Sequence, residues 1–302
     1  MTKPAISLVV CAYNMDRELP RTLRSLSPLM QRTIREPEYE VIVVDNGSSR
    51  PITDADCRKF GANVRRIRID NALPSPALAM NRGINAARAP LIGAMIDGAR
   101  LASPRLLACA TWAARLSRRA VVITLGFHLG TKVQMESVLN GYDTEAEDKL
   151  LEATAWTRDG YRLFDISVFA GSSARGWFQP ITESNALFMH RTLWNELGGF
   201  DQAFSLSGGG LVNLDLFRRA LSLPDSLPVT LLGEGTFHQV HGGVATNARS
   251  DVLDRFEREY RTIRGQSYSA PAYNSLYLGR MDEAAARSIC RSIETFVASN
   301  DD

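Results

Sequence analysis

The stretch ISLVVCAYN, residues 6–14, is a continuous run of β-branched and apolar residues that ends in polar side chains. Such a run is typical of a strand covered on both faces, as the strands of a parallel sheet are. The stretches YEVIVVDNGS (39–48) and LIGAMID (91–97) repeat this pattern. These three runs predict buried parallel strands, and they decide the fold class.

Helix-like stretches lie between the predicted strands. ELPRTLRSLSPLM (18–30) spaces its leucines at three and four residues, and SPALAMNRGINAARA (75–89) begins with a proline and continues with small residues. NVRRIRID (63–70) reads as a further strand. This alternation predicts an α/β fold in which right-handed crossovers build a mainly parallel, Rossmann-like central sheet flanked by helices.

Polar side chains follow three of the predicted strands. Ligands of open parallel sheets bind beyond the carboxyl ends of the strands, so we expect these side chains to share one crevice. An alternative is that the two aspartates only form turns and cap the next helix. The residues concerned are Tyr13, Asn14, Asp45, Asn46 and Asp97.

Composition excludes several classes of protein. The 302 residues carry 35 basic and 33 acidic side chains, a net charge of +2, which is not the basic field that drives nucleic-acid binding. The four cysteines form no C-x-x-C pair, which argues against a zinc site or a disulfide framework. With no signal peptide or long apolar run, we expect a cytoplasmic protein, with a peripheral position on the inner face of the membrane as the alternative.

Five motifs resemble, in order, those of the inverting family 2 glycosyltransferases with the GT-A fold. VVCAYN and VIVVDNGS resemble the first two nucleotide-contacting strands, and NALPSPALAMNRGINAARAP resembles the segment before the metal motif. GAMID falls where the aspartate-x-aspartate motif belongs, and NALFMHRTLWNELGGFDQAF resembles the acceptor-side segment. The resemblance covers roughly residues 5–220 and implies transfer of a sugar from a nucleotide-diphosphate donor.

The resemblance implies a set of binding residues. Asp97 would be the first carboxylate of a Mn²⁺ or Mg²⁺ site that holds the donor diphosphate, where the cation neutralises the leaving group. Asn46 replaces an aspartate that contacts uracil in some relatives, so a uridine donor is not assumed. The implied donor-binding residues are Ala12, Tyr13, Asn14, Asp45, Asn46, Asn81, Asp97 and Arg100.

The chain departs from the family at the metal motif, where Ala99 replaces the second acid and Arg100 follows. Three explanations are open: His238 completes the metal site, Arg100 neutralises the diphosphate in place of a metal, or the chain binds without turnover. His238 and His241 are three apart, so strand geometry would direct them to opposite faces unless the backbone turns between them.

A second departure concerns the general base. The family places a glutamate–aspartate pair after the glycine loop, where this chain has Val212 and Asn213, and an amide cannot take a proton. Glu183 is the better substitute. Asp215 is the reserve, because two positions along a helix turn a side chain by about 200°.

The resemblance also divides the chain. We expect a glycosyltransferase-like domain over residues 1–245, with a nucleotide-binding half (1–100) and an acceptor-side half (101–245), and a C-terminal helical extension over 246–302. Expected partners are the nucleotide-sugar donor, a glycan or lipid-linked glycan acceptor of cell-surface polysaccharide synthesis, and a second copy bound through the C-terminal helices. Alternatives are an inactive binding module and, less favoured, a nucleotidyltransferase, which lacks its glycine-rich, lysine-bearing loop here.

Overall fold

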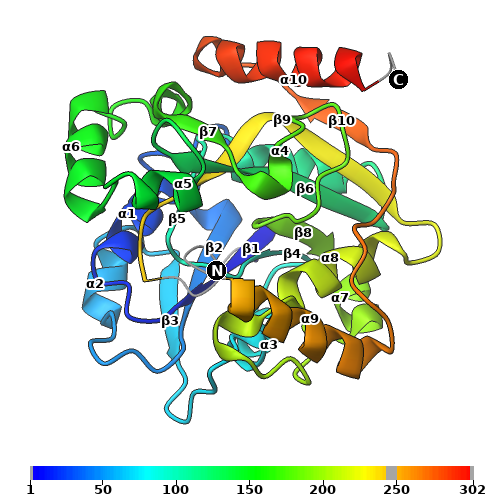
Figure 1. Cartoon of the computed structure of the whole chain (residues 1–302). Helices are drawn as coiled ribbons and strands as arrows, with labels where there is room; N and C mark the ends of the chain where they lie inside the picture. The colour runs from blue at the N-terminus through cyan, green and yellow to red at the C-terminus, as the bar shows by residue number, and fades with distance from the viewer. Residues whose placement is uncertain (1–2, 243–249, 300–302) are drawn as a thin grey trace.

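The computed structural model describes residues 3–242 and 250–299, and a single mixed sheet runs through it (Figure 1). Its strands follow the order β10-β9-β6-β8-β4-β1-β2-β3, while β5 pairs with β9 and β7 with β6. The strands are β1 (Ile6–Ala12), β2 (Tyr39–Asp45), β3 (Val64–Arg68), β4 (Leu91–Met95), β5 (Arg100–Ala102), β6 (Ala120–Leu129), β7 (Ser167–Phe169), β8 (Leu187–His190), β9 (Leu227–His238) and β10 (Leu276–Gly279).

Most strand pairs are parallel, as the sequence predicts. β4, β1, β2 and β3 are parallel neighbours, and Val10 in β1 lies opposite Val43 in β2 and Met95 in β4. All residues of β1, β2 and β4 are buried, which explains why their sequences are apolar on both faces. The exception in the middle is β8, which runs antiparallel to β4 and β6. The fold is therefore a mixed, mostly parallel α/β sheet of GT-A type.

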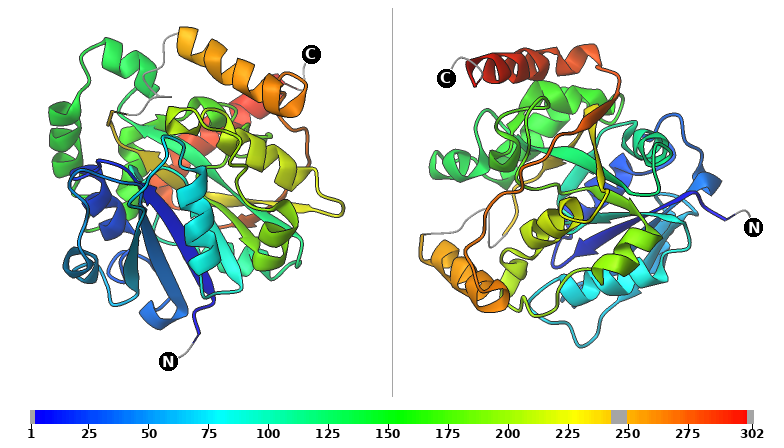
Figure 2. Two further views of the ribbon diagram at one scale, coloured as in Figure 1. Left: turned by 90° about the horizontal axis from the view of Figure 1, so that it is seen from below. Right: turned by 90° about the vertical axis from the view of Figure 1, so that its right-hand side faces the viewer.

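Helices cover both faces of the sheet (Figure 2). Alternate residues of each strand point to opposite faces, so Val9 packs in the layer with α3, α7 and α8, whereas Leu8 packs in the layer with α1 and α4. The helices are α1 (Glu18–Ser25), α2 (Asp54–Arg58), α3 (Ala77–Ala86), α4 (Leu106–Ala114), α5 (Gln134–Leu139), α6 (Thr144–Thr154), α7 (Arg191–Leu197), α8 (Val212–Leu221), α9 (Ser250–Arg264) and α10 (Ala286–Ala298).

The C-terminal part contains the two expected helices, α9 and α10, and also a strand that the sequence did not predict. β10 lies between them and pairs in parallel with β9, so this part extends the central sheet. The boundary expected at residues 245/246 lies outside the described residues. Ile293, Phe296 and Val297 are about half-exposed on α10, where the expected self-association would occur. Within the described residues, no helix is long and apolar enough to cross a membrane.

Candidate functional site

The carboxyl ends of β1, β2 and β4 meet at one edge of the sheet. Asp45 ends β2 opposite Ala12, the last residue of β1, and Asp97 follows the end of β4 by two residues. Burial raises the pKa of the Cys11 thiol in β1 to about 12, and the Asp97 and Asp45 carboxylates add to that rise. Tyr13 is 57% exposed at the same end. The strand ends thus bring two carboxylates and an exposed aromatic ring to one rim.

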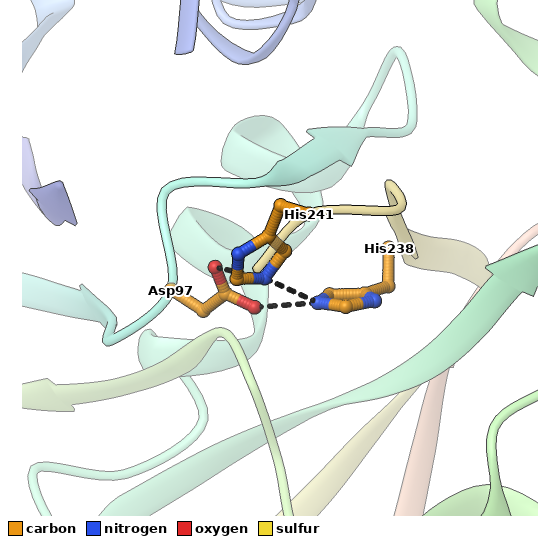
Figure 3. Close-up of side chains that lie close together, drawn as sticks. All are labelled: Asp97, His238 and His241. Atoms are coloured by element: carbon orange, nitrogen blue, oxygen red, sulfur yellow. Dashed lines mark hydrogen bonds and ion pairs between the residues drawn. The ribbon is translucent and has the colours of Figure 1, made fainter. Parts of the chain in front are cut away.

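Asp97 faces two histidine rings (Figure 3). Its Oδ2 atom lies 2.8 Å from Nε2 of His238, and its Oδ1 atom lies 3.6 Å from Nε2 of His241. The two Nε2 atoms are 3.1 Å apart, and one ligand atom from each residue lies within 4.8 Å of the other two. A carboxylate oxygen and two imidazole nitrogens directed at one point form a donor set for a divalent transition metal.

The strands β5 and β9 explain how the histidines reach Asp97. Arg100 in β5 lies opposite His238 in β9, and the Gln239 N–H donates to the Ala99 carbonyl over 2.9 Å. β9 ends at His238, so strand alternation does not apply beyond it and the chain turns His241 back toward Asp97. The backbone turns between the two histidines, which is the condition under which the sequence allowed both of them to join the site.

The environment of His238 fits a bound cation. Its Nδ1–H donates to Oε1 of Gln134, a buried residue at the start of α5. Burial lowers the pKa of His238 to about 4, so the ring is neutral at physiological pH. A bare Nε2 then faces a carboxylate oxygen, and two facing lone pairs are stabilised by a cation between them.

Arg100 lies beside this cluster. The side chain is buried, and its Nε atom is 3.5 Å from Oδ2 of Asp97. Among the described residues, neither Nε nor Nη1 has a hydrogen-bond partner. Burial lowers the pKa of Arg100, and the nearby Asp97 and Glu183 carboxylates oppose this effect. A buried guanidinium with unused donors is suited to an anionic ligand.

Glu183 and Asn213 lie together on the acceptor side of the site. Oε1 of Glu183 accepts a 2.6 Å hydrogen bond from the side-chain amide of Asn213, in the first turn of α8. The Asn213 amide also donates to the Ser184 carbonyl. The structure therefore places an amide on α8 and, directly beside it, a carboxylate from the loop before β8.

A cavity of about 400 Å³ opens next to the end of β2. Asp45 and Ala12 line its inner part, and one oxygen of Asp45 accepts the Ser48 N–H. The neighbouring Asn14 is fixed by its loop, since its Oδ1 accepts the N–H of Ser49. The remaining lining is largely apolar, which suits a flat nucleobase: Met15, Leu19, Pro20, Pro51, Ile52 and Phe60.

Two asparagines from the predicted donor site make internal bonds. The side-chain amide of Asn81 forms two hydrogen bonds of 2.8 Å with the backbone of Phe200: it donates to the carbonyl and accepts from the N–H. We therefore do not assign Asn81 to the donor, because both polar atoms of its amide are used in fixing α3. Asn46 donates to the Leu73 carbonyl, whereas its buried Oδ1 has no partner among the described residues and is able to accept from a ligand.

Asp215 does not lie free in the site. It is buried on α8 and forms ion pairs with Arg219 at 2.7 Å and with Arg264 of α9 at 2.6 Å. Both carboxylate oxygens accept from these guanidiniums. The reserve assignment of Asp215 as a base is therefore withdrawn, because this carboxylate joins α8 to α9.

Sequence reasoning weighed His241 but assigned only His238 to the metal site, and it missed Gln134, which bonds His238. His241 could have been found from the glycines that follow it, since QVHGG indicates that the strand ends before its second histidine. Gln134 had no such signal, because it reaches His238 from a helix 104 residues away.

Comparisons with known proteins agree with this geometry. Residues 7–136 match the family Glycosyl transferase family 2. The match contains β1, β2, β4 and Asp97. It ends before α6 and before both histidines of the cluster.

Two validoxylamine A glucosyltransferases from Streptomyces hygroscopicus, of the subspecies limoneus and jinggangensis (strain 5008), are each 25% identical in an alignment of 292 residues that covers 91% of this chain. The chain spans 61% and 65% of their lengths. The S. aureus TarS 1–349 complexes with UDP and UDP-GlcNAc share the fold of this chain, with TM-scores of 0.50 and 0.52 at 13% identity. They align with 96% of this chain and 70% and 71% of theirs.

Proposed function

We propose that the chain is an inverting glycosyltransferase that moves a sugar, of hexosyl type, from a nucleotide-diphosphate donor to a hydroxyl group of a glycan or lipid-linked glycan. The observation that carries the proposal is the convergence of Asp97, His238 and His241 beside the unpaired donors of Arg100. The family 2 domain, the glucosyltransferase relatives and the UDP-GlcNAc complex of a protein with this fold support it.

The donor nucleoside is assigned to the rim at β1 and β2. Tyr13 offers an exposed ring for stacking, and Asp45 and Oδ1 of Asn46 offer acceptors for base or ribose. Arg100 would donate to the diphosphate, whose charge grows as it leaves. The identity of the donor nucleobase is not assigned, because the side-chain N–H of Asn46 already donates to the Leu73 carbonyl.

Asp97, His238 and His241 would hold the divalent cation. When bound, that ion would neutralise the departing diphosphate. Two imidazole ligands favour Mn²⁺ over Mg²⁺, which prefers oxygen donors. Of the three explanations for Ala99, completion of the site by histidine is therefore the one we propose, with Arg100 as an additional cationic group.

Glu183 is proposed as the general base. Its hydrogen bond from Asn213 holds the carboxylate in place. In this role Glu183 takes the acceptor hydroxyl's proton as the oxygen attacks the anomeric carbon. Asn213 orients the base and takes no proton itself.

A donor screen tests the proposal. Purified protein is incubated with UDP-, GDP- and dTDP-sugars, with Mn²⁺, Mg²⁺ or EDTA, and nucleotide binding and nucleoside diphosphate release are both measured. We expect Mn²⁺-dependent binding and slow donor hydrolysis with at least one donor. Tight binding without turnover under any metal and with any acceptor would instead identify a binding module. Absence of binding to every nucleotide would contradict both.

A further inference from the structure

The turn that carries His241 lies outside the family match and is held by Glu147, which is also outside it, and by Arg17, which is inside it. Val240 lies between the two histidines, and its N–H donates to Oε2 of Glu147 over 2.8 Å. Its carbonyl accepts from Nη1 of Arg17 over 3.1 Å. Both backbone groups of this one residue are therefore bonded to charged side chains.

These two side chains also bind each other. Nη2 of Arg17 lies 3.1 Å from Oε1 of Glu147, so the arginine, the glutamate and the Val240 peptide form a closed ring of hydrogen bonds. Glu147 is fully buried on α6, and Arg17 precedes α1. Burying a carboxylate is costly unless its partners are well placed, so this ring favours one position of the Val240 backbone.

The position of His241 depends on that backbone. His238 is fixed by β9 and by Gln134, whereas His241 follows the end of the strand and has no such framework from the sheet. Gln239 completes the hold on the turn, because its side-chain amide donates to the Glu18 carbonyl over 3.2 Å.

We infer that Glu147, paired with Arg17, is a positioning residue that places His241 at the cation site. The inference rests on the proposed function, since it assigns the ring a purpose in metal binding. It also makes α6, a helix at the edge of the molecule (Figure 1), part of the site's support.

Asp148 supplies a matched control. It is the next residue on α6 and also pairs with Arg17, but it has no bond to Val240. Glu147→Ala and Asp148→Ala thus each remove one carboxylate partner of Arg17 from the same helix, and only Glu147→Ala releases the turn. Glu147→Gln keeps an oxygen that can accept from Val240 and serves as the rescue variant.

The test measures Mn²⁺ affinity by calorimetry and by the electron paramagnetic resonance of free Mn²⁺. Supporting partners of metal ligands affect affinity by about 10-fold to 100-fold, so we expect Glu147→Ala to weaken binding at least tenfold. Asp148→Ala should change it less than threefold, and Glu147→Gln should recover most of the loss. Because Glu147 acts through His241, adding His241→Ala to Glu147→Ala should cause little further loss. Additive losses would overturn the inference.

Crystal structures of the wild type and Glu147→Ala, both without metal, separate this inference from the proposed function. We expect His241 to move away from Asp97 in the variant while His238 stays in place. An unmoved His241 overturns the positioning role, whatever the protein binds. If His241 moves but the wild type binds neither Mn²⁺ nor nucleotide, the proposed function fails and the positioning of His241 stands.

Discussion

Oε1 of Glu183 accepts a 2.6 Å hydrogen bond from the amide of Asn213, although 30 residues separate them in the chain. Asn213 stands on α8 where the resemblance to the family places a carboxylate, and Glu183 supplies a carboxylate directly beside it. An aspartate in place of Asn213 would set two carboxylates at this spot, and like charges this close resist ionising together. The amide of Asn213 therefore suits a base at Glu183.

Glu183→Gln should lower kcat by about 100-fold to 10,000-fold while leaving donor affinity within about twofold, because only proton removal is lost. Asn213→Ala keeps the carboxylate and should cost less than Glu183→Gln. Steady-state kinetics and donor titration measure both effects. Near wild-type turnover in Glu183→Gln would exclude this residue as the base.

His238→Ala and His241→Ala should each weaken Mn²⁺-dependent donor binding by about tenfold or more, since each removes one of three ligands. His190→Ala is the control, because His190 lies on β8 and its Nε2 contacts the carbonyl of Ala114 at the end of α4, away from the cluster. Calorimetric titration of donor with Mn²⁺ and with EDTA provides the comparison. Equal effects of all three variants would contradict the assignment of ligands.

Arg100→Met should weaken donor binding and should destabilise the fold less than Asp215→Asn does. The buried guanidinium has unmade hydrogen bonds, which cost free energy, but its removal also leaves Asp97 without the ion pair at 3.5 Å. The same change removes a partner of the diphosphate. Urea unfolding and nucleoside diphosphate titration report the two effects, and a destabilised variant with intact affinity would argue that Arg100 is structural.

Asp215→Asn should reduce stability rather than chemistry. Breaking one side of a buried ion pair typically costs about 3 to 5 kcal/mol, and here Arg219 and Arg264 both lose a charged partner. We expect a lower urea midpoint, with kcat changed far less than in Glu183→Gln at a temperature where both variants are folded. A loss of kcat as large as that of Glu183→Gln would restore Asp215 as a candidate base.

Glu234 should make stability depend on pH. Burial raises the pKa of this carboxyl above its ordinary 4.5, despite hydrogen bonds from Ser103 and Tyr161 that lower it. The native chain then holds this proton more tightly than the unfolded chain, so the group's stabilising contribution is present below about pH 4.5 and is lost as pH rises through the native pKa. Relative to Glu234→Gln, the wild type should lose free energy of unfolding as the pH rises above about 4.5. Glu145→Gln, at an exposed position, is the control.

The sequence by itself determined the sheet and the edge where the site lies. The continuous apolar runs of β1, β2 and β4 require burial on both faces, and parallel pairing then brings Asp45 and Asp97 to the same end. These properties are local, because the hydrophobic pattern of each strand can be read from its own residues without reference to the rest of the chain.

Only the tertiary structure decided which side chains meet at that edge. His241 joins the cluster because β9 ends at His238 and the chain turns after it. Gln134 contacts His238 from a helix 104 residues away, and Glu147 contacts Val240 from a helix 93 residues away. Asn81 and Asp215 match the sequence expectations by position, but their polar groups bond other parts of the chain. Asn81 bonds the Phe200 backbone, and Asp215 pairs with two arginines. Periodicity records whether a residue is buried, whereas the partner of a buried polar group depends on where distant loops turn.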